Sequence, residues 1–241
     1  MINLKNSKIF YDPYPHALFQ NVFETEFYSN LCNEFPEVSN FERFDYDKQK
    51  NLKQKKFVLN DNSSLFARTI KNRKNIKKLY NYLSSEKFKN IIIEYLEKNS
   101  ITLQKTYPSN IFMKIFDRKK KKFGFEFSMI STDGGFIKPH TDGADKLISF
   151  VIPILSDENF SRVVNSETSI LKPTEDKYKY NYLNKTVPFE ATELVKKISF
   201  NKNQIFLFIK THNSLHSVGP MISPFKDVIM RKSINFFMYK Y

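Results

Sequence analysis

The sequence contains one cysteine, five glycines and no tryptophan among its 241 residues. A single thiol, Cys32, cannot form an internal disulfide, and it excludes zinc and iron–sulfur sites that need several thiolates. The five glycines include no phosphate-cradling loop. No stretch approaches the roughly 20 apolar residues of a membrane span, and Met1–Phe10 lacks the apolar core of a signal peptide. We therefore expect a protein of the reducing cytoplasm.

Positive charge is plentiful, since 39 Lys and Arg residues against 25 Asp and Glu give a net charge of +14. Such an excess raises the question of nucleic-acid binding, which releases counterions from phosphates. Here the charge is spread out and dominated by lysine, and no aromatic stacking motif accompanies it. We interpret it as solvated surface, with the densest run, Arg118–Lys122, at the tip of a hairpin. Nucleic-acid binding is thus the less favoured hypothesis.

The first part of the chain, residues 1–105, is expected to be mainly helical and to act as a support region. After Tyr14-Pro15-His16, apolar residues recur at i+4 up to Pro36 (Phe23, Phe27, Leu31, Phe35), the stripe of an amphipathic helix. Residues 65–83 and 88–96 show the same spacing. Cys32 falls on the first helix as a small core residue.

From residue 106 onward, short runs rich in Phe, Ile and Val predict strands. They are Ile111–Phe116, Phe123–Ser131, Lys146–Leu155, Glu193–Ser199, Gln204–Ile209 and Val228–Tyr239. Many short strands after a block of helices favour an α+β fold with a mainly β core, an antiparallel sandwich or jelly roll supported on one face. We expect one domain, 1–241, in which 156–189 is a long loop, either a lid or a surface insertion.

The candidate chemistry begins with His140 and Asp142, two residues apart at the entrance to an apolar strand. On extended backbone, residues i and i+2 project to one face, so both side chains can bind one cation. His216, far downstream, is the candidate for a third ligand. Two His and one carboxylate leave positions open on ferrous iron for a 2-oxo acid and dioxygen. An open catalytic zinc site would use the same residues.

Downstream of His216, Arg231 and Ser233 share one face of a predicted strand. A guanidinium binds a carboxylate through two parallel hydrogen bonds, and the hydroxyl adds another, so the pair could hold the distal carboxylate of 2-oxoglutarate. An edge-strand salt bridge is the alternative for Arg231. Asn235 lies on the same face. The setting of His212 is typical of a turn and that of His16 of a packed or exposed residue, so we expect neither to bind metal.

The ordered segments around these residues resemble the prolyl-4-hydroxylase-like group of iron(II)/2-oxoglutarate oxygenases. Phe127–Ser131, Asp133–Phe136, Pro139–Asp142 and Lys146–Ser149 are similar to the first metal-binding strand pair, and Asn203–Phe208, Leu215–Val218 and Arg231–Phe236 to the closing strands. Near the start of the chain, Pro13–His16 and Phe35-Pro36 resemble the beginning of many family members more loosely. Two departures stand out: a long gap between His216 and Arg231, which requires a loop through 220–227, and Val164–Thr168 in place of a glycine-rich strand.

The resemblance implies a double-stranded β-helix and a function. His140, Asp142 and His216 would hold Fe(II) and act in catalysis, while Arg231, Ser233 and Ser128 would bind 2-oxoglutarate. With O2 as the second co-substrate, a C–H bond of an unidentified small-molecule or peptidyl substrate would be hydroxylated, releasing succinate and CO2. Asp142 favours hydroxylation, because halogenating relatives lack this carboxylate. The alternative is a non-catalytic, cupin-like metal- or ligand-binding protein.

Overall fold

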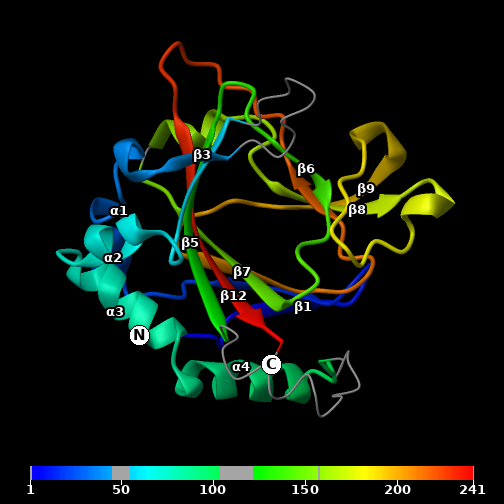
Figure 1. Ribbon diagram of the computed structural model, residues 1–241, viewed down its shortest axis with the longest axis horizontal. Helices are drawn as coiled ribbons and strands as arrows, with labels where there is room; N and C mark the ends of the chain where they lie inside the picture. The colour runs from blue at the N-terminus through cyan, green and yellow to red at the C-terminus, as the bar shows by residue number, and fades with distance from the viewer. Residues whose placement is uncertain (1, 45–54, 104–121, 157, 241) are drawn as a thin grey trace.

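The computed structural model describes residues 2–44, 55–103, 122–156 and 158–240. The predicted strand Ile111–Phe116 and nearly all of the basic run Arg118–Lys122 lie outside these ranges. Two antiparallel sheets form the core, one of eight strands in the order β1-β2-β10-β7-β12-β5-β4-β3 and one of four in the order β6-β11-β8-β9. Helices α1 to α4 cover one side of the large sheet, and the small sheet lies on the other (Figure 1).

The large sheet combines strands from both ends of the sequence. Its members are β1 (Ser7–Phe10), β2 (His16–Gln20), β3 (Glu42–Phe44), β4 (Lys56–Asn60), β5 (Phe123–Ser131), β7 (Lys146–Ile154), β10 (Gln204–Ile209) and β12 (Met230–Tyr239). The small sheet contains β6 (Ile137–His140), β8 (Thr168–Pro173), β9 (Thr192–Ile198) and β11 (His216–Val218). These two antiparallel sheets confirm the predicted mainly β core.

The helices form where the sequence has apolar spacing, and two of them begin at a capping serine. They are α1 (Thr25–Asn33), α2 (Ser64–Ile70), α3 (Lys74–Leu83) and α4 (Glu86–Lys98). Ser63 and Ser85 accept the N–H groups of Leu65 and Phe88 at 3.2 Å and so cap α2 and α4. None of the helices in the described ranges is long and apolar enough to cross a membrane.

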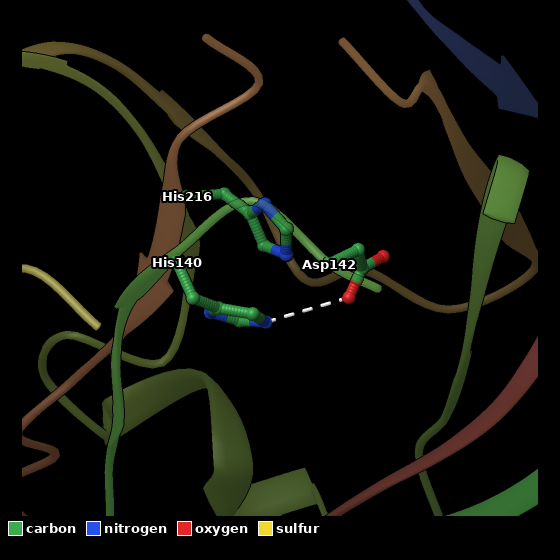
Figure 2. Close-up of side chains that lie close together, drawn as sticks. All are labelled: His140, Asp142 and His216. Carbon is green, nitrogen blue, oxygen red and sulfur yellow. Dashed lines mark ion pairs between the residues drawn. The ribbon is translucent and has the colours of Figure 1, made fainter. Parts of the chain in front are cut away.

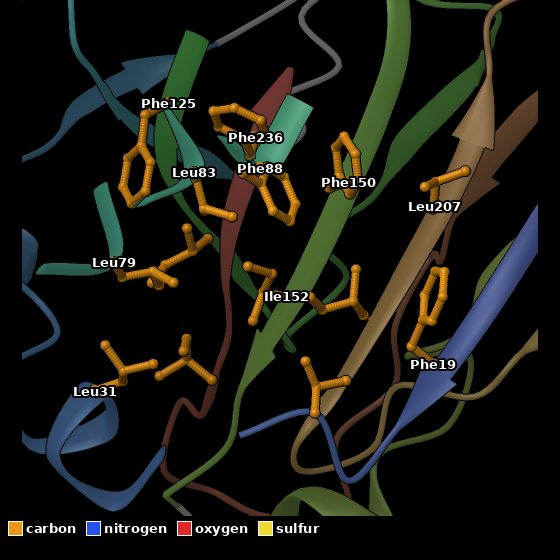
Figure 3. Close-up of a cluster of buried hydrophobic side chains, with 14 of the residues drawn as sticks. Phe19, Leu31, Leu79, Leu83, Phe88, Phe125, Phe150, Ile152, Leu207 and Phe236 are labelled. Atoms are coloured by element: carbon orange, nitrogen blue, oxygen red, sulfur yellow. The ribbon is translucent and has the colours of Figure 1, made fainter. Parts of the chain in front are cut away.

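The core between the helices and the large sheet is built on strand alternation. In β5, Phe125 and Phe127 face the helices, whereas Glu126 and Ser128 face the small sheet. Phe88 of α4 is fully buried and packs against two rings of the large sheet, with centroid distances of 5.7 Å to Phe150 and 5.9 Å to Phe236. Figure 3 shows this cluster. The helices thus support one face of the sheet and leave its other face to the small sheet.

Two expectations about the elements need correction. The region 1–105 contains strands as well as helices, because β1 to β4 belong to it beside the longer α1 to α4, and His16 begins strand β2 rather than preceding a helix. The segment 156–189 is not one loop, because β8 pairs with β9 and β11 in the small sheet. Both errors have the same cause: short strands of mixed polarity are held by their neighbours in the sheet, and their own sequence carries little periodicity.

Candidate metal centre

Three predicted ligands converge between the two sheets. His140 ends β6 and His216 begins β11, and the two residues are direct partners across these antiparallel strands. Their ring centroids are 4.3 Å apart. With Asp142 they offer three ligand atoms that all lie within 4.8 Å of one another, and His140 Nε2 is 3.5 Å from Asp142 Oδ1. Figure 2 shows the three side chains pointing to a common centre.

The backbone reason for this convergence differs from the one expected. Strand β6 stops at His140, and Asp142 adopts φ = +69°, in the left-handed region. Aspartate tolerates this conformation better than most non-glycine residues. The carboxylate therefore reaches the centre through a tight turn of the chain, and the predicted alternation along an extended strand does not apply at Asp142.

The imidazoles are oriented by backbone carbonyls. Nδ1 of His140 lies 2.9 Å from the carbonyl oxygen of Lys138, and Nδ1 of His216 lies 3.0 Å from that of Ser214. A carbonyl can only accept, so each Nδ1 carries the proton. The lone pair then resides on Nε2. This tautomer is the one that metal-binding histidines use when the metal is on Nε2.

Electrostatics keep Asp142 and His216 in their ligand forms. Burial raises the pKa of Asp142, but the ammonium of Lys146 at 3.3 Å outweighs burial and holds that pKa well below its usual range. Burial, assisted by His140, lowers the pKa of His216 to about 3. Asp142 also accepts a 2.6 Å hydrogen bond from the Ser149 hydroxyl at Oδ2. An ionised carboxylate and a neutral imidazole are what a cation requires.

Arg231 is buried, with 3% of its surface exposed, on the face of β12 that looks toward the small sheet. Its Nε donates to the Ser166 carbonyl at 2.8 Å, its Nη2 donates to Thr168 Oγ1 at 3.2 Å, and the guanidinium stacks 3.7 Å from the Phe200 ring centre. No carboxylate of the described residues lies within ion-pair distance. Burial lowers the pKa of Arg231 to about 9 despite the nearby Glu167. Such a cation lacks the anion that would normally accompany it.

One cavity of about 90 Å³ joins Arg231 to the three candidate ligands. Ser128 and Ser233 line it as direct partners across β5 and β12. All six residues predicted from the sequence therefore face the same space. Its other lining residues are Lys56, Ile137, Lys146, Ser149, Val151, Thr168, Phe208, Val218, Asn235 and Phe237. With the carboxylates in the described ranges, Arg231 does not form the edge-strand salt bridge considered for it.

Several contacts of this site were not predicted. Ser149 was missed although it is the one hydroxyl in the apolar strand β7, a signal that could have been used. Thr168 and Ser166 were missed because β8 was not recognised as a strand. His212 is not part of this group of three ligands and stacks on Tyr180 with ring centroids 4.9 Å apart. His16 is buried, and its Nδ1 contacts the Tyr14 carbonyl at 2.9 Å.

Comparison with known proteins finds similarity in structure but not in sequence. No protein-family model and no curated protein matches the chain. Among solved structures, a prolyl hydroxylase from Trichoplax adhaerens, in complex with a hypoxia inducible factor peptide fragment, has 11% identity and a TM-score of 0.53, covering 93% of this chain and 83% of its own. The Fe(II)/α-ketoglutarate-dependent dioxygenase TqaL has 13% identity and a TM-score of 0.51, covering 90% and 76%.

The fold is that of the iron(II)/2-oxoglutarate oxygenases. The predicted double-stranded β-helix is thereby confirmed. Within this oxygenase fold, the loop from Gly219 to Ile229 spans the long gap between His216 and Arg231, and it contains only an isolated bridge from Ile222 to Val164. The extra length is absorbed outside the sheets, so that Arg231 still faces the cavity.

Proposed function

We propose that this chain is an iron(II)- and 2-oxoglutarate-dependent dioxygenase that hydroxylates a C–H bond of its substrate. The observation that carries the proposal is one cavity containing two imidazoles, an ionised carboxylate and a buried guanidinium that has no carboxylate partner among the described residues. Each feature alone is common in proteins. Their combination in one cavity matches a metal ion and an anionic co-substrate held side by side.

The residues fit a divalent metal ion. His140 and His216 would bind through Nε2, and Asp142 through the oxygen that already faces His140. Three ligands from one side leave adjacent positions open, as in the two-histidine-one-carboxylate sites of non-haem iron oxygenases. When bound, iron and 2-oxoglutarate supply the oxidising chemistry, in which the oxo acid loses CO2 to become succinate and a substrate C–H bond is oxidised by O2.

Arg231 would anchor the co-substrate. A buried guanidinium has a fork of donors that fits a carboxylate, and its Nε and one Nη2 bond are already used to fix its orientation. Ser233 lies two residues along the same strand face, and Ser128 is its partner across β5. The Ser128 hydroxyl would donate to the same carboxylate, and the Ser233 hydroxyl, which now donates to Asn235 Oδ1 at 3.1 Å, would rotate to do so. Burial of the site excludes water, which strengthens these charge-assisted bonds.

The substrate would be a small molecule or a peptidyl residue. The Trichoplax hydroxylase was solved with a peptide, and we extend to this chain only the expectation that the open end of the cavity receives an organic substrate. The ionised Asp142 favours hydroxylation over halogen transfer.

The test is calorimetric titration of the metal-free protein with iron(II) under anaerobic conditions, then with 2-oxoglutarate, followed by measurement of succinate after admission of air. We expect binding of both and succinate release. His140→Ala should abolish them. His212→Ala is the matched control, because His212 lies outside the cluster, and it should behave as the wild type.

Each alternative has its own result. Binding of 2-oxoglutarate and iron without succinate would identify a non-catalytic binding protein. Turnover with zinc and none with iron would point to an open zinc site. Equal binding and turnover in the wild type and in His140→Ala would refute the proposal.

A further inference from the structure

Lys146 is a lysine of the cavity that the proposed function does not use. Its side chain is 17% exposed and its ammonium lies 3.3 Å from Asp142 Oδ1. On its other side, the ammonium lies 3.5 Å from the centre of the Phe237 ring. Lys146 lines the cavity together with Phe237 and the three candidate ligands. A cation–π contact and a single carboxylate oxygen thus hold this charge at the wall of the site.

Lys146 is far from Arg231 along the same sheet. Its ammonium meets β12 at the Phe237 ring, six residues beyond Arg231, so the backbone positions of these two β12 residues are roughly 20 Å apart at about 3.3 Å per residue. A distal carboxylate of 2-oxoglutarate that is held by Arg231 is therefore not the anion expected beside Lys146.

Two further lysines add positive charge next to Lys146. Lys210 is buried, and its ammonium donates to two neutral oxygens, Thr141 Oγ1 at 2.9 Å and the Thr211 carbonyl at 3.1 Å. Lys240 donates to the Ala144 carbonyl at 2.8 Å and to the Tyr182 hydroxyl. Among the described carboxylates, Asp142 forms an ion pair with Lys146, and none forms one with Lys210. Against these three lysines the turn from Thr141 to Lys146 offers two carboxylates, Asp142 and Asp145, so one net positive charge remains.

Charge balance in the loaded site leaves Lys146 without an anion. This step rests on the proposed function. The two positive charges of the metal ion and that of Arg231 would be offset by Asp142 and by the two carboxylates of 2-oxoglutarate. Once Asp142 binds the metal ion, its charge no longer neutralises Lys146. A partly buried ammonium without a counter-charge is costly, and an anion placed beside it removes this cost.

We infer that the substrate carries an oxyanion, a carboxylate or a phosphate, which pairs with Lys146 while an apolar part of the substrate packs against Phe237. Lys146 is then a specificity-determining residue. Asn235, on the same face of β12 between Ser233 and Phe237, borders the same part of the cavity.

The experiment uses three probes of one chain length: pentanoate, pentyl phosphate and the neutral pentanamide. Each is titrated calorimetrically into protein loaded anaerobically with iron(II) and 2-oxoglutarate. At least one anion should bind at least tenfold more tightly than pentanamide. The better of the two anions identifies the source of the oxyanion. In Lys146→Met this preference should disappear, and in Lys146→Arg it should be retained.

Controls separate the possible failures. Lys226→Met removes an exposed lysine outside the cavity and should keep the preference, and a thermal melt checks that each variant is folded. Equal binding of all three probes to the loaded wild type would overturn the inference, as would an unchanged preference in Lys146→Met. So would an equally large loss of 2-oxoglutarate affinity in Lys146→Met, because Lys146 would then belong to the co-substrate. A wild type that takes up neither iron nor 2-oxoglutarate refutes the proposed function itself, and this inference with it.

Discussion

His140 and His216 are direct partners across two short antiparallel strands, with their rings 4.3 Å apart. Pairing in a sheet fixes the distance between opposing side chains. The separation of the two imidazoles is therefore set by the backbone ladder of β6 and β11. Asp142 is positioned separately, by a left-handed turn and by the hydroxyl of Ser149.

Ser149→Ala should weaken metal binding about 10- to 100-fold, because loss of a group that orients a ligand usually has this effect. The Ser149 hydroxyl donates to Asp142 Oδ2 at 2.6 Å, so the variant leaves that carboxylate free to rotate. Anaerobic iron(II) titration measures the change. Ser161→Ala, at an exposed position, is the control. An affinity equal to that of the wild type would mean that Ser149 does not orient Asp142.

Arg231→Lys should raise the dissociation constant for 2-oxoglutarate about 10- to 100-fold while iron(II) still binds. Lysine keeps the positive charge but lacks the fork of donors, and a hydrogen bond to a charged group contributes about 1.5–3 kcal/mol. Titration of the iron-loaded protein with 2-oxoglutarate measures the loss. Arg162→Lys, a change at an exposed arginine, should have no effect. Unchanged affinity in Arg231→Lys would assign the anchor to another residue.

Lys210→Met should raise the free energy of unfolding at pH 7 by about 1–3 kcal/mol, since a well-packed apolar side chain often replaces a buried charge favourably. Burial, with Lys240 and Lys146, lowers the pKa of Lys210 to about 8, although Asp142 opposes the shift. The unfolded chain therefore binds more protons than the folded one between about pH 8 and 10.5, and wild-type stability rises with pH there. The advantage of Lys210→Met should shrink over this range in urea unfolding. A constant difference would contradict this account.

Phe88→Ala should lower the free energy of unfolding by about 3–5 kcal/mol, the usual cost of removing a buried ring. The Phe88 ring joins α4 to the sheet through Phe150 and Phe236. Urea denaturation at equilibrium gives the value. Lys87→Ala on the exposed side of α4 should change it by less than about 0.5 kcal/mol. A loss below 1 kcal/mol in Phe88→Ala would show that α4 is not a packed support of the sheet.

The sequence predicted the long strands and singled out six residues that line one cavity, and it missed the short strands. Strands β5 and β10 were predicted with their observed ends, because their apolar residues are buried on both faces or alternate strongly. Strand β8 was missed, since Thr168–Pro173 is stabilised by β9 and β11 and contains two hydroxyl residues. The contacts of Arg231 with Ser166 and Thr168 depend on that strand, so pattern alone could not reveal them.

The candidate site also joins the two sheets mechanically. His140 and His216 belong to the small sheet, whereas Arg231 and the Ser149 partner of Asp142 belong to the large one. A metal ion and a dianion bound at this site would connect the two sheets. Because they would bind the folded protein and not the unfolded chain, they would stabilise the fold. When the metal concentration falls but still exceeds the dissociation constant, the free energy of unfolding would decrease while most sites stay occupied. Proteolysis would then become faster before turnover is lost.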